Sequence, residues 1–117
     1  MARLEKKSLD QPDETRPVKN GNVEVVELEG ATVMRTTFEP GWRWSESVKP
    51  VVGTDSCQVH HVGYVISGRM HIQMDGGEEL EVGPGEVIQI PPGHDAWIVG
   101  DEPYVGLDFK GGAEYAK

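Results

Sequence analysis

The stretch CQVHHVGYVISGRM, residues 57 to 70, places a cysteine and two adjacent histidines at the start of an apolar, β-branched run. Thiolate and imidazole groups are competent ligands for transition metals. Adjacent residues of a strand point to opposite faces, so at most one of His60 and His61 can face a core. The first question is therefore what the inward histidine does.

Short β-branched or aromatic runs alternate with turn residues along most of the chain, which is the pattern of an all-β fold. No segment spaces apolar residues at the helical period over three turns. The expected strands number about eight and span residues 23–28, 31–38, 58–67, 69–74, 78–82, 86–90, 95–99 and 104–109. Such a set of strands suits a closed barrel or a sandwich.

Glycine and proline mark the connections between these strands. Gly76 and Gly77 stand where a tight hairpin requires a positive φ, and the stretches VGPGE and IPPGH separate the next strands. No helix is expected after these turns, so they are not phosphate-binding loops. The sequence therefore predicts no nucleotide cofactor.

Length and charge limit the class of protein. The 117 residues suit one domain, and 11 basic against 20 acidic residues give a formal net charge of −9. A surface of that sign repels nucleic acid and anionic membranes, so neither is expected as a partner. The single cysteine cannot form an internal disulfide, and residues 1–20 lack the apolar stretch of a signal peptide. A cytoplasmic location is expected.

Residues 1–22 are polar, contain Pro12 and Pro17 and lack strand alternation, so we interpret them as an N-terminal arm or tail. The arm could be disordered or could lie over a partner subunit. Residues 23–117 form the predicted single barrel domain.

The stretch from Tyr64 to His94 resembles the cupin superfamily, whose members are small jelly-roll β-barrels (double-stranded β-helices). The resemblance rests on Gly68 at the end of the first conserved motif, on the Gly-rich hairpin, and on the spacing of Gly85, Pro91 and Gly93 in the second. It extends over roughly residues 31–109 and implies the fold, whereas one barrel of this kind carries many unrelated chemistries.

Metal-binding cupins hold a divalent metal with three histidines and one glutamate, and this sequence departs from that set. Counted back from Gly68, the glutamate position is His61. With a three-residue gap, the two histidine positions of the first motif are Cys57 and Asp55. The last histidine position is Ala96.

The replacements are themselves possible ligands. His94 lies two residues before the last position and shares its face if the strand has begun there. The resemblance thus suggests a rearranged metal site of Cys57, His61 and His94, with Asp55 as a fourth ligand or as a group that orients an imidazole. Thiolate and imidazole together favour zinc or ferrous iron, and manganese, nickel and copper are not excluded.

Each of these residues also has a structural interpretation. Cys57 could be a small buried hydrophobe, His61 a neutral core histidine satisfied by a carbonyl or tyrosine, and His94 a turn residue. A four-residue gap would place Thr54 and Ser56, poor zinc ligands, at the histidine positions.

Three further residues are candidates for ligand binding. Trp44, in the stretch GWRW, could line a pocket by stacking, although such residues more often cover a barrel core or a dimer contact. Gln58 and Gln89 are polar residues inside strand runs, so either could contact a ligand or point outward.

Two functions of different class follow. One is a metal-dependent enzyme that acts on a small organic molecule, with unassigned reaction and catalytic residues. The other is a non-catalytic module with a degenerate metal site that binds or senses a small molecule in the barrel, where Trp44 and polar strand residues would select it. Nucleophilic hydrolysis is not expected, because no spacing sets a nucleophile beside an oriented base. A homodimer is expected, partly by analogy with the family.

Overall fold

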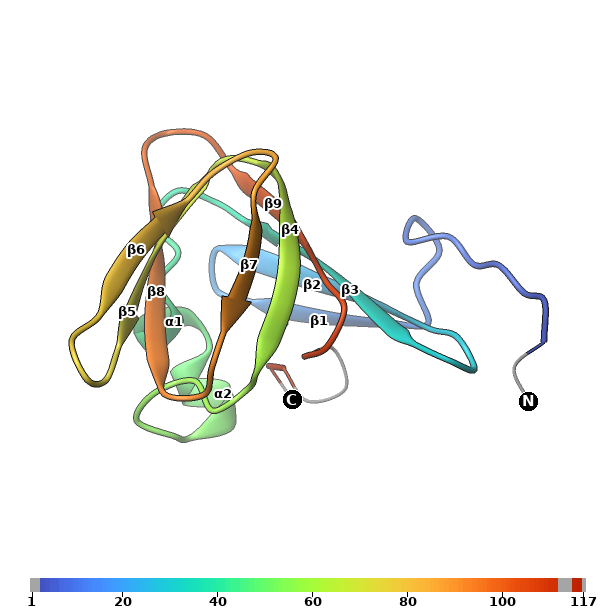
Figure 1. Cartoon of the computed structure of the whole chain (residues 1–117), viewed down its shortest axis with the longest axis horizontal. Helices are drawn as coiled ribbons and strands as arrows, with labels where there is room; N and C mark the ends of the chain where they lie inside the picture. The colour runs from blue at the N-terminus through green and yellow to red at the C-terminus, as the bar shows by residue number, and fades with distance from the viewer. Residues whose placement is uncertain (1–2, 112–114, 117) are drawn as a thin grey trace.

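The computed structural model describes residues 3–111 and 115–116. Within these residues, nine strands and two short helices follow one another (Figure 1). They are β1 (Glu14–Val18), β2 (Gly21–Glu27), β3 (Thr32–Phe38), α1 (Trp44–Ser47), α2 (Lys49–Val52), β4 (His61–Ser67), β5 (Arg69–Met74), β6 (Glu79–Val82), β7 (Val87–Ile90), β8 (His94–Val99) and β9 (Tyr104–Asp108). None of the helices in the described residues is long and apolar enough to cross a membrane.

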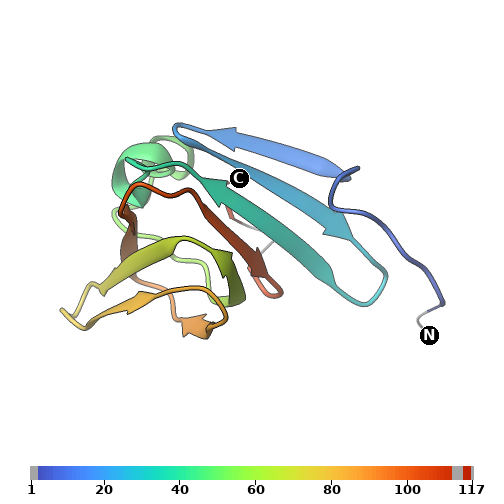
Figure 2. The same cartoon turned by 90° about the horizontal axis from the view of Figure 1, so that it is seen from above.

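The strands form two antiparallel sheets that face each other. The larger has the order β1-β2-β3-β9-β4-β7 and the smaller the order β6-β5-β8. Seen from above, β1, β2 and β3 extend well beyond the barrel toward the N-terminus (Figure 2). The predicted all-β, jelly-roll architecture is confirmed.

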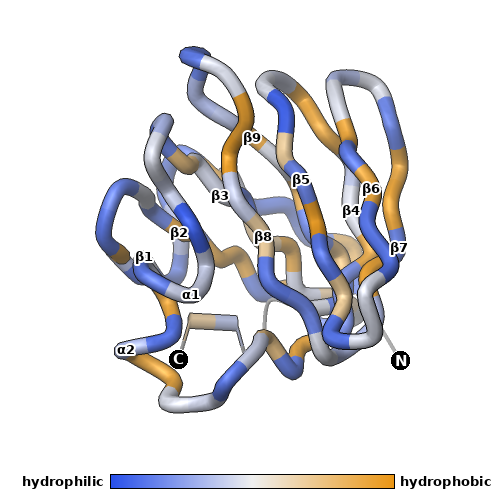
Figure 3. Tube along the Cα trace, turned by 90° about the vertical axis from the view of Figure 1, so that its left-hand side faces the viewer, coloured by the Kyte–Doolittle hydropathy of each residue, from blue (hydrophilic) through white to orange (hydrophobic). Residues whose placement is uncertain are grey.

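Strand alternation places the core between the sheets (Figure 3). Along β8, His94, Ala96 and Ile98 are buried while the residues between them are partly exposed. Val23 and Val25 of β2 and other apolar side chains of both sheets complete one continuous core. The interior of the barrel therefore receives every second residue of strands such as β8 and β9.

Strand β1 lies inside residues 1–22, which the sequence analysis assigned to an arm. It is an edge strand of the larger sheet and pairs with β2 through a two-residue turn in which Asn20 has a φ of 61°. Pro17 fits this position, because an edge strand tolerates a residue that lacks an N–H group. The arm without regular structure is therefore confined to the residues before Glu14.

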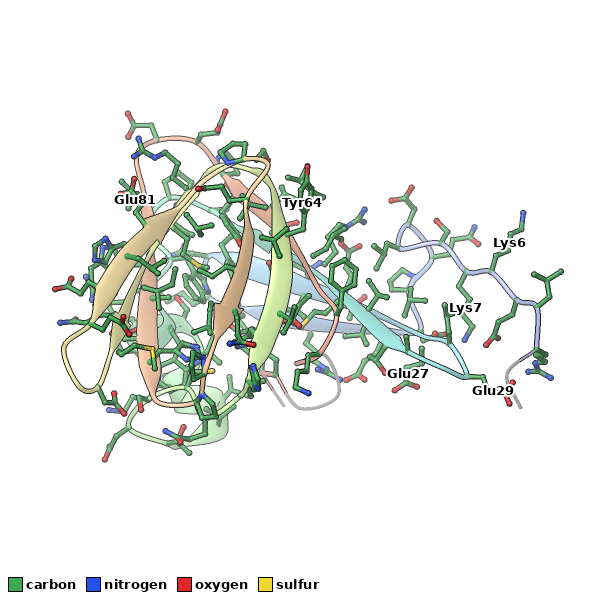
Figure 4. All side chains as sticks on the ribbon, in the orientation of Figure 1. Lys6, Lys7, Glu27, Glu29, Tyr64 and Glu81 are labelled. Carbon is green, nitrogen blue, oxygen red and sulfur yellow. The ribbon has the colours of Figure 1, made fainter. Side chains whose placement is uncertain are left out.

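Charged side chains of the arm meet the β2–β3 hairpin. Figure 4 labels Lys6 and Lys7 on the arm and Glu27 and Glu29 at the β2–β3 hairpin, far from Tyr64 and Glu81 on the barrel. Lys7 Nζ lies 2.9 Å from Asp13 Oδ2, and the same carboxylate accepts a hydrogen bond from the Glu27 N–H. These exposed pairs hold the arm on its own chain but contribute little stability each.

Helices α1 and α2 fill the connection between β3 and β4. Each has four residues, too few for a helical period to be visible in the sequence. Helix α2 has a proline in its first turn and ends at Gly53, which has a φ of 79°. The two helices bring Trp44 and Val48 into the core and close one end of the barrel.

Candidate metal centre

Cys57 lies just before β4 and is fixed against the start of β8. Its N–H donates to the carbonyl of His94 over 2.7 Å, and its own carbonyl accepts from the N–H of Gly93, also over 2.7 Å. These backbone bonds carry no sequence preference, so they cannot be found from residue types. They place the Cys57 side chain in the barrel interior, where it is only 2% exposed.

Two strands bring the histidines to the same place. His61 begins β4 opposite Ile90, and His94 begins β8 opposite Met74. Both side chains are buried, at 9% and 3% exposure. His60 is half-buried and lies outside this group. The strand face therefore selects His61, as alternation requires.

The ligand atoms of Cys57, His61 and His94 all lie within 4.8 Å of one another. The Cys57 sulfur is 3.6 Å from His61 Nε2, and the two imidazole centroids are 5.4 Å apart. Since zinc–nitrogen and zinc–sulfur bonds measure about 2.0–2.3 Å, two ligand atoms of one ion lie at most about 4.6 Å apart. Small side-chain movements therefore suffice for one ion to contact all three.

The second nitrogen of each imidazole is already engaged. His61 Nδ1 donates to Asp108 Oδ2 in a short hydrogen bond, and His94 Nδ1 donates to the Pro91 carbonyl over 2.8 Å. Both partners are acceptors, so Nδ1 carries the proton in each ring. Nε2 is then the atom of each ring left for a metal, which is how metal-binding histidines are normally held. Without a metal, His61 Nε2 contacts the Cys57 sulfur.

Asp108 is a functional residue that the sequence analysis missed. It ends β9, where Tyr104, Gly106 and Asp108 share the inward face. Its Oδ1 accepts hydrogen bonds of 2.8 Å from the N–H groups of Lys110 and Gly111, and it is only 6% exposed. An acidic residue at an inward position of a strand was the available signal, but its partner is 47 residues away.

Burial and charge act against each other in this group. Burial opposes ionisation of the Cys57 thiol, but hydrogen bonds and charge from His61 and His94 outweigh it and lower the Cys57 pKa to about 6. Burial disfavours a charged His61, yet Asp108 and Cys57 raise the His61 pKa to about 9. Burial also raises the pKa of Asp108, but His61 and two backbone N–H groups bring it below its ordinary value. At neutral pH the Cys57, His61 and Asp108 side chains are therefore charged inside the barrel.

The structure does not bring Asp55 to this group. Its side chain is fully exposed, and one oxygen lies 3.8 Å from Lys49 Nζ. Cys57 and Asp55 are separated by a bend that precedes β4, so strand alternation does not apply between them. The carboxylate near the group comes instead from Asp108.

The residues predicted to bind a ligand have different positions. Trp44 is 2% exposed and lines the cavity beside the group. Gln58 is exposed and its amide nitrogen donates to Ser56, whereas Gln89 is exposed on β7 and lies outside the cavity lining. Of these three, only Trp44 lies beside His61 and His94.

Two cavities flank the group. The first, of about 60 Å³, lies inside the barrel and is lined by His61, His94 and Asp108 among mainly apolar side chains. The second, of about 170 Å³, lies beside α2 and is lined by Cys57, Thr54 and Gln58. Trp44 and Tyr115 line both. A small molecule can therefore reach the group inside the barrel.

The expectation that no nucleophile stands beside an oriented base is wrong. Cys57, His61 and Asp108 form a continuous chain of side-chain contacts. The two intervals of 4 and 47 residues correspond to no local motif, so the sequence could not reveal this arrangement.

Comparisons with known proteins point to one family. The model of the cupin domain matches residues 51–109, half of the chain, including Cys57, His61, His94 and Asp108. No curated protein matches the chain.

Solved structures share the fold. A protein of unknown function from Rhizobium leguminosarum is 21% identical, with a TM-score of 0.66 over 92% of this chain and 96% of that one. A mutant of the Bacillus subtilis oxalate decarboxylase is 25% identical, with a TM-score of 0.61 over 92% of this chain but only 29% of the decarboxylase. A putative ethanolamine utilization protein Q from Salmonella typhimurium is 14% identical, with a TM-score of 0.55 over 80% and 71%. Together with the matched segment, these findings show that the chain belongs to the cupin family.

Proposed function

We propose that this cupin binds a divalent transition metal, zinc or ferrous iron, through Cys57 Sγ, His61 Nε2 and His94 Nε2, and that it acts on a small molecule in the barrel. The observation that carries the proposal is the engagement of both Nδ1 atoms by oxygen acceptors, together with the grouping of both Nε2 atoms and the Cys57 sulfur within 4.8 Å. The ion would take the place of the proton shared between His61 Nε2 and the Cys57 sulfur. A structural core histidine needs no such arrangement of two rings around one sulfur.

The donor set fits these metals better than others. Thiolate and imidazole are soft or borderline ligands, whereas magnesium and calcium prefer oxygen. Three protein ligands leave a coordination position for water or substrate, as in catalytic zinc sites. When bound, such an ion polarises a substrate oxygen or activates a water molecule.

The chain's own residues have defined tasks in this proposal. Asp108 fixes the proton of His61 on Nδ1 and orients the ring, and the Pro91 carbonyl does the same for His94. The apolar lining of the cavity keeps bulk water away from the reacting group.

Elemental analysis of tag-free protein tests the proposal. We expect a metal-to-protein ratio near one in the wild type and in the matched control His71→Ala, whose imidazole lies on the outer surface beside Trp97. We expect the metal to be lost in Cys57→Ser and in His94→Ala, with folding of each variant checked by circular dichroism. A wild type that stays free of metal after incubation with zinc and with ferrous iron would contradict the proposal.

The contacts between Cys57, His61 and Asp108 favour a second candidate that needs no metal. The Cys57 thiolate would attack an acyl carbon and form a C–S bond while the carbonyl electrons move to oxygen. Re-formation of the carbonyl expels the leaving group, which takes a proton from His61 Nε2. The same elemental analysis distinguishes the two, because this candidate requires a metal-free protein that is labelled by an activated ester at Cys57.

A further inference from the structure

We infer that the barrel cavity takes a small neutral molecule with a carbonyl-type oxygen, which accepts hydrogen bonds from the indole N–H groups of Trp42 and Trp44. The inference rests on the proposed function, because it names the substrate class of the same site. It follows from unpaired donors, from the charge of the site and from the lining of the cavity.

The indole nitrogens of Trp42 and Trp44 are buried and have no hydrogen-bond partner among the described residues. Buried indole N–H groups usually have an acceptor, and leaving one unpaired is unfavourable. Both rings are 2% exposed and both line the cavity. Among the described residues, the other buried polar side-chain atoms without a hydrogen-bond partner are Ser47 Oγ and His60 Nε2. Neither residue lines the cavity.

The Trp42 ring is held in place by its neighbours. It stacks on Phe38 with a centroid distance of 3.9 Å and an interplanar angle of 9°, and Phe38 lies in turn beside Tyr104 at 6.0 Å. The Trp42 backbone is also tied, because its carbonyl accepts a hydrogen bond from the Ile98 N–H over 3.1 Å. A fixed donor next to the cavity favours a ligand that brings its own acceptor.

The charge of the site selects a neutral ligand. No lysine or arginine lines the cavity in the described part of the chain. The charge of a divalent ion is offset by the Cys57 thiolate and the Asp108 carboxylate, so the loaded site has no net positive charge. A carboxylate ligand would lose its hydration there without gaining a cationic partner.

The nearest arginines are engaged elsewhere. Arg43 lies over the Trp97 ring, 4.2 Å from its centroid, and 3.6 Å from Asp95. Arg16 donates to the Tyr115 carbonyl and pairs with Glu14. Neither Arg43 nor Arg16 lines the cavity, so neither supplies a positive charge to a ligand there.

Most of the remaining lining is hydrocarbon or aromatic, and Thr36, Tyr104 and Tyr115 add hydroxyl groups. The apolar part includes Met34, Phe38, Met70, Ile88 and Ile90. Methionine and branched aliphatic side chains pack against the hydrocarbon part of a ligand. The cavity therefore has a mainly apolar lining to which Trp42 and Trp44 each add an indole N–H donor.

Acetone, acetate and 2-methylpropene test the inference, because these planar molecules of four heavy atoms suit a cavity of about 60 Å³ and differ in acceptor and charge. The readout is the indole N–H resonances of ¹⁵N-labelled protein, which has three tryptophans. Trp97 is the internal control, because it lies outside the cavity lining and stacks on His71. Assignment uses Trp42→Phe, Trp44→Phe and Trp97→Phe.

We expect acetone to shift the Trp42 and Trp44 resonances downfield and to leave Trp97 unchanged. Acetate should bind more than about tenfold more weakly, because its charge is desolvated without a partner. 2-Methylpropene should bind without the downfield shift. Each of Trp42→Phe and Trp44→Phe should weaken acetone binding by about two- to tenfold, and Trp97→Phe should not.

Equal binding of acetate and acetone, or absence of an indole shift with every probe, would overturn the inference. The titrations are run on metal-free protein and on protein incubated with zinc or with ferrous iron, and metal content is measured separately. Metal uptake without indole shifts would refute the inference and leave the metal proposal standing. Indole shifts in a protein that takes up neither metal would refute the metal proposal and support the neutral-ligand cavity.

Discussion

His61 and Asp108 form a buried hydrogen-bonded pair across β4 and β9, although 47 residues separate them. The carboxylate holds the proton on His61 Nδ1 and directs Nε2 toward the Cys57 sulfur. Replacement of this carboxylate is therefore the most direct perturbation of the site that leaves all three ligands in place.

We expect Asp108→Asn to weaken zinc binding by about 10- to 100-fold, because the outer partner of a metal-binding histidine sets its orientation and basicity. Competition with a chromogenic chelator measures the affinity. The exposed Asp101 supplies the matched control, Asp101→Asn, which should bind zinc like the wild type. Equal affinity in both variants would show that Asp108 does not act on the metal.

The thiolate of metal-free protein should form at unusually low pH. The Cys57 pKa is about 6, against about 8.5 for an unperturbed cysteine, so the thiolate absorbance in the far ultraviolet should rise around pH 6. Cys57→Ser provides the baseline. In His61→Gln the positive partner is lost, so the midpoint should move toward higher pH; an unchanged midpoint would mean that His61 does not stabilise the thiolate.

Acid should remove a stabilising contribution of Asp108. Its pKa is below the ordinary value of about 3.9, so its contribution is complete above that pH and is lost as the pH falls through the lowered value. Urea unfolding of metal-free protein between neutral pH and pH 2 should show a steeper loss of stability below pH 4 in the wild type than in Asp108→Asn. Parallel curves for the two proteins would contradict the shift.

Metal binding should stabilise the fold, because the three ligands lie on segments that precede β4, begin β4 and begin β8. At a free zinc concentration about 100 times Kd, the free energy of unfolding should rise by about 2.7 kcal/mol. Chelation should reverse the gain, and His94→Ala should show none. A wild type whose unfolding midpoint ignores zinc would argue against the site.

Gly68 lies in the turn between β4 and β5, and Gly77, in the turn between β5 and β6, is its matched control. Both have a positive φ, but an added Cβ at Gly68 would lie 2.4 Å from the Pro103 carbonyl oxygen, whereas nothing lies within 4 Å at Gly77. Gly77→Ala should cost about 1 kcal/mol from backbone strain alone. Gly68→Ala should cost clearly more, by thermal unfolding. Equal losses would mean that the close approach to Pro103 does not limit this turn.

The sequence predicted the parts of the fold that depend on local patterns. All eight expected strands are present, because their alternation and their Gly and Pro turns are local properties. Strand β1 was missed because Pro17 and the polar residues around it resemble a tail, and only the partner strand reveals an edge position.

The sequence could predict only those site residues whose direction is set by their position on a strand. His61 and His94 each begin a strand, so their inward direction follows from alternation. The position of Asp55 depends on an irregular connection, where no period applies, and the contribution of Asp108 depends on the register of β9 against β4. Register between distant strands is not encoded in any short stretch.

The two cavities give the centre an unusual topology. Cys57 borders the chamber beside α2, whereas His61 and His94 border the chamber inside the barrel. The group thus lies between the two cavities, with the Cys57 side chain toward one and the two imidazoles toward the other. Thr54 and Gln58 are exposed at the rim of the sulfur side. A thiol-directed ion can therefore approach the Cys57 sulfur from the α2 side while a small molecule occupies the cavity inside the barrel.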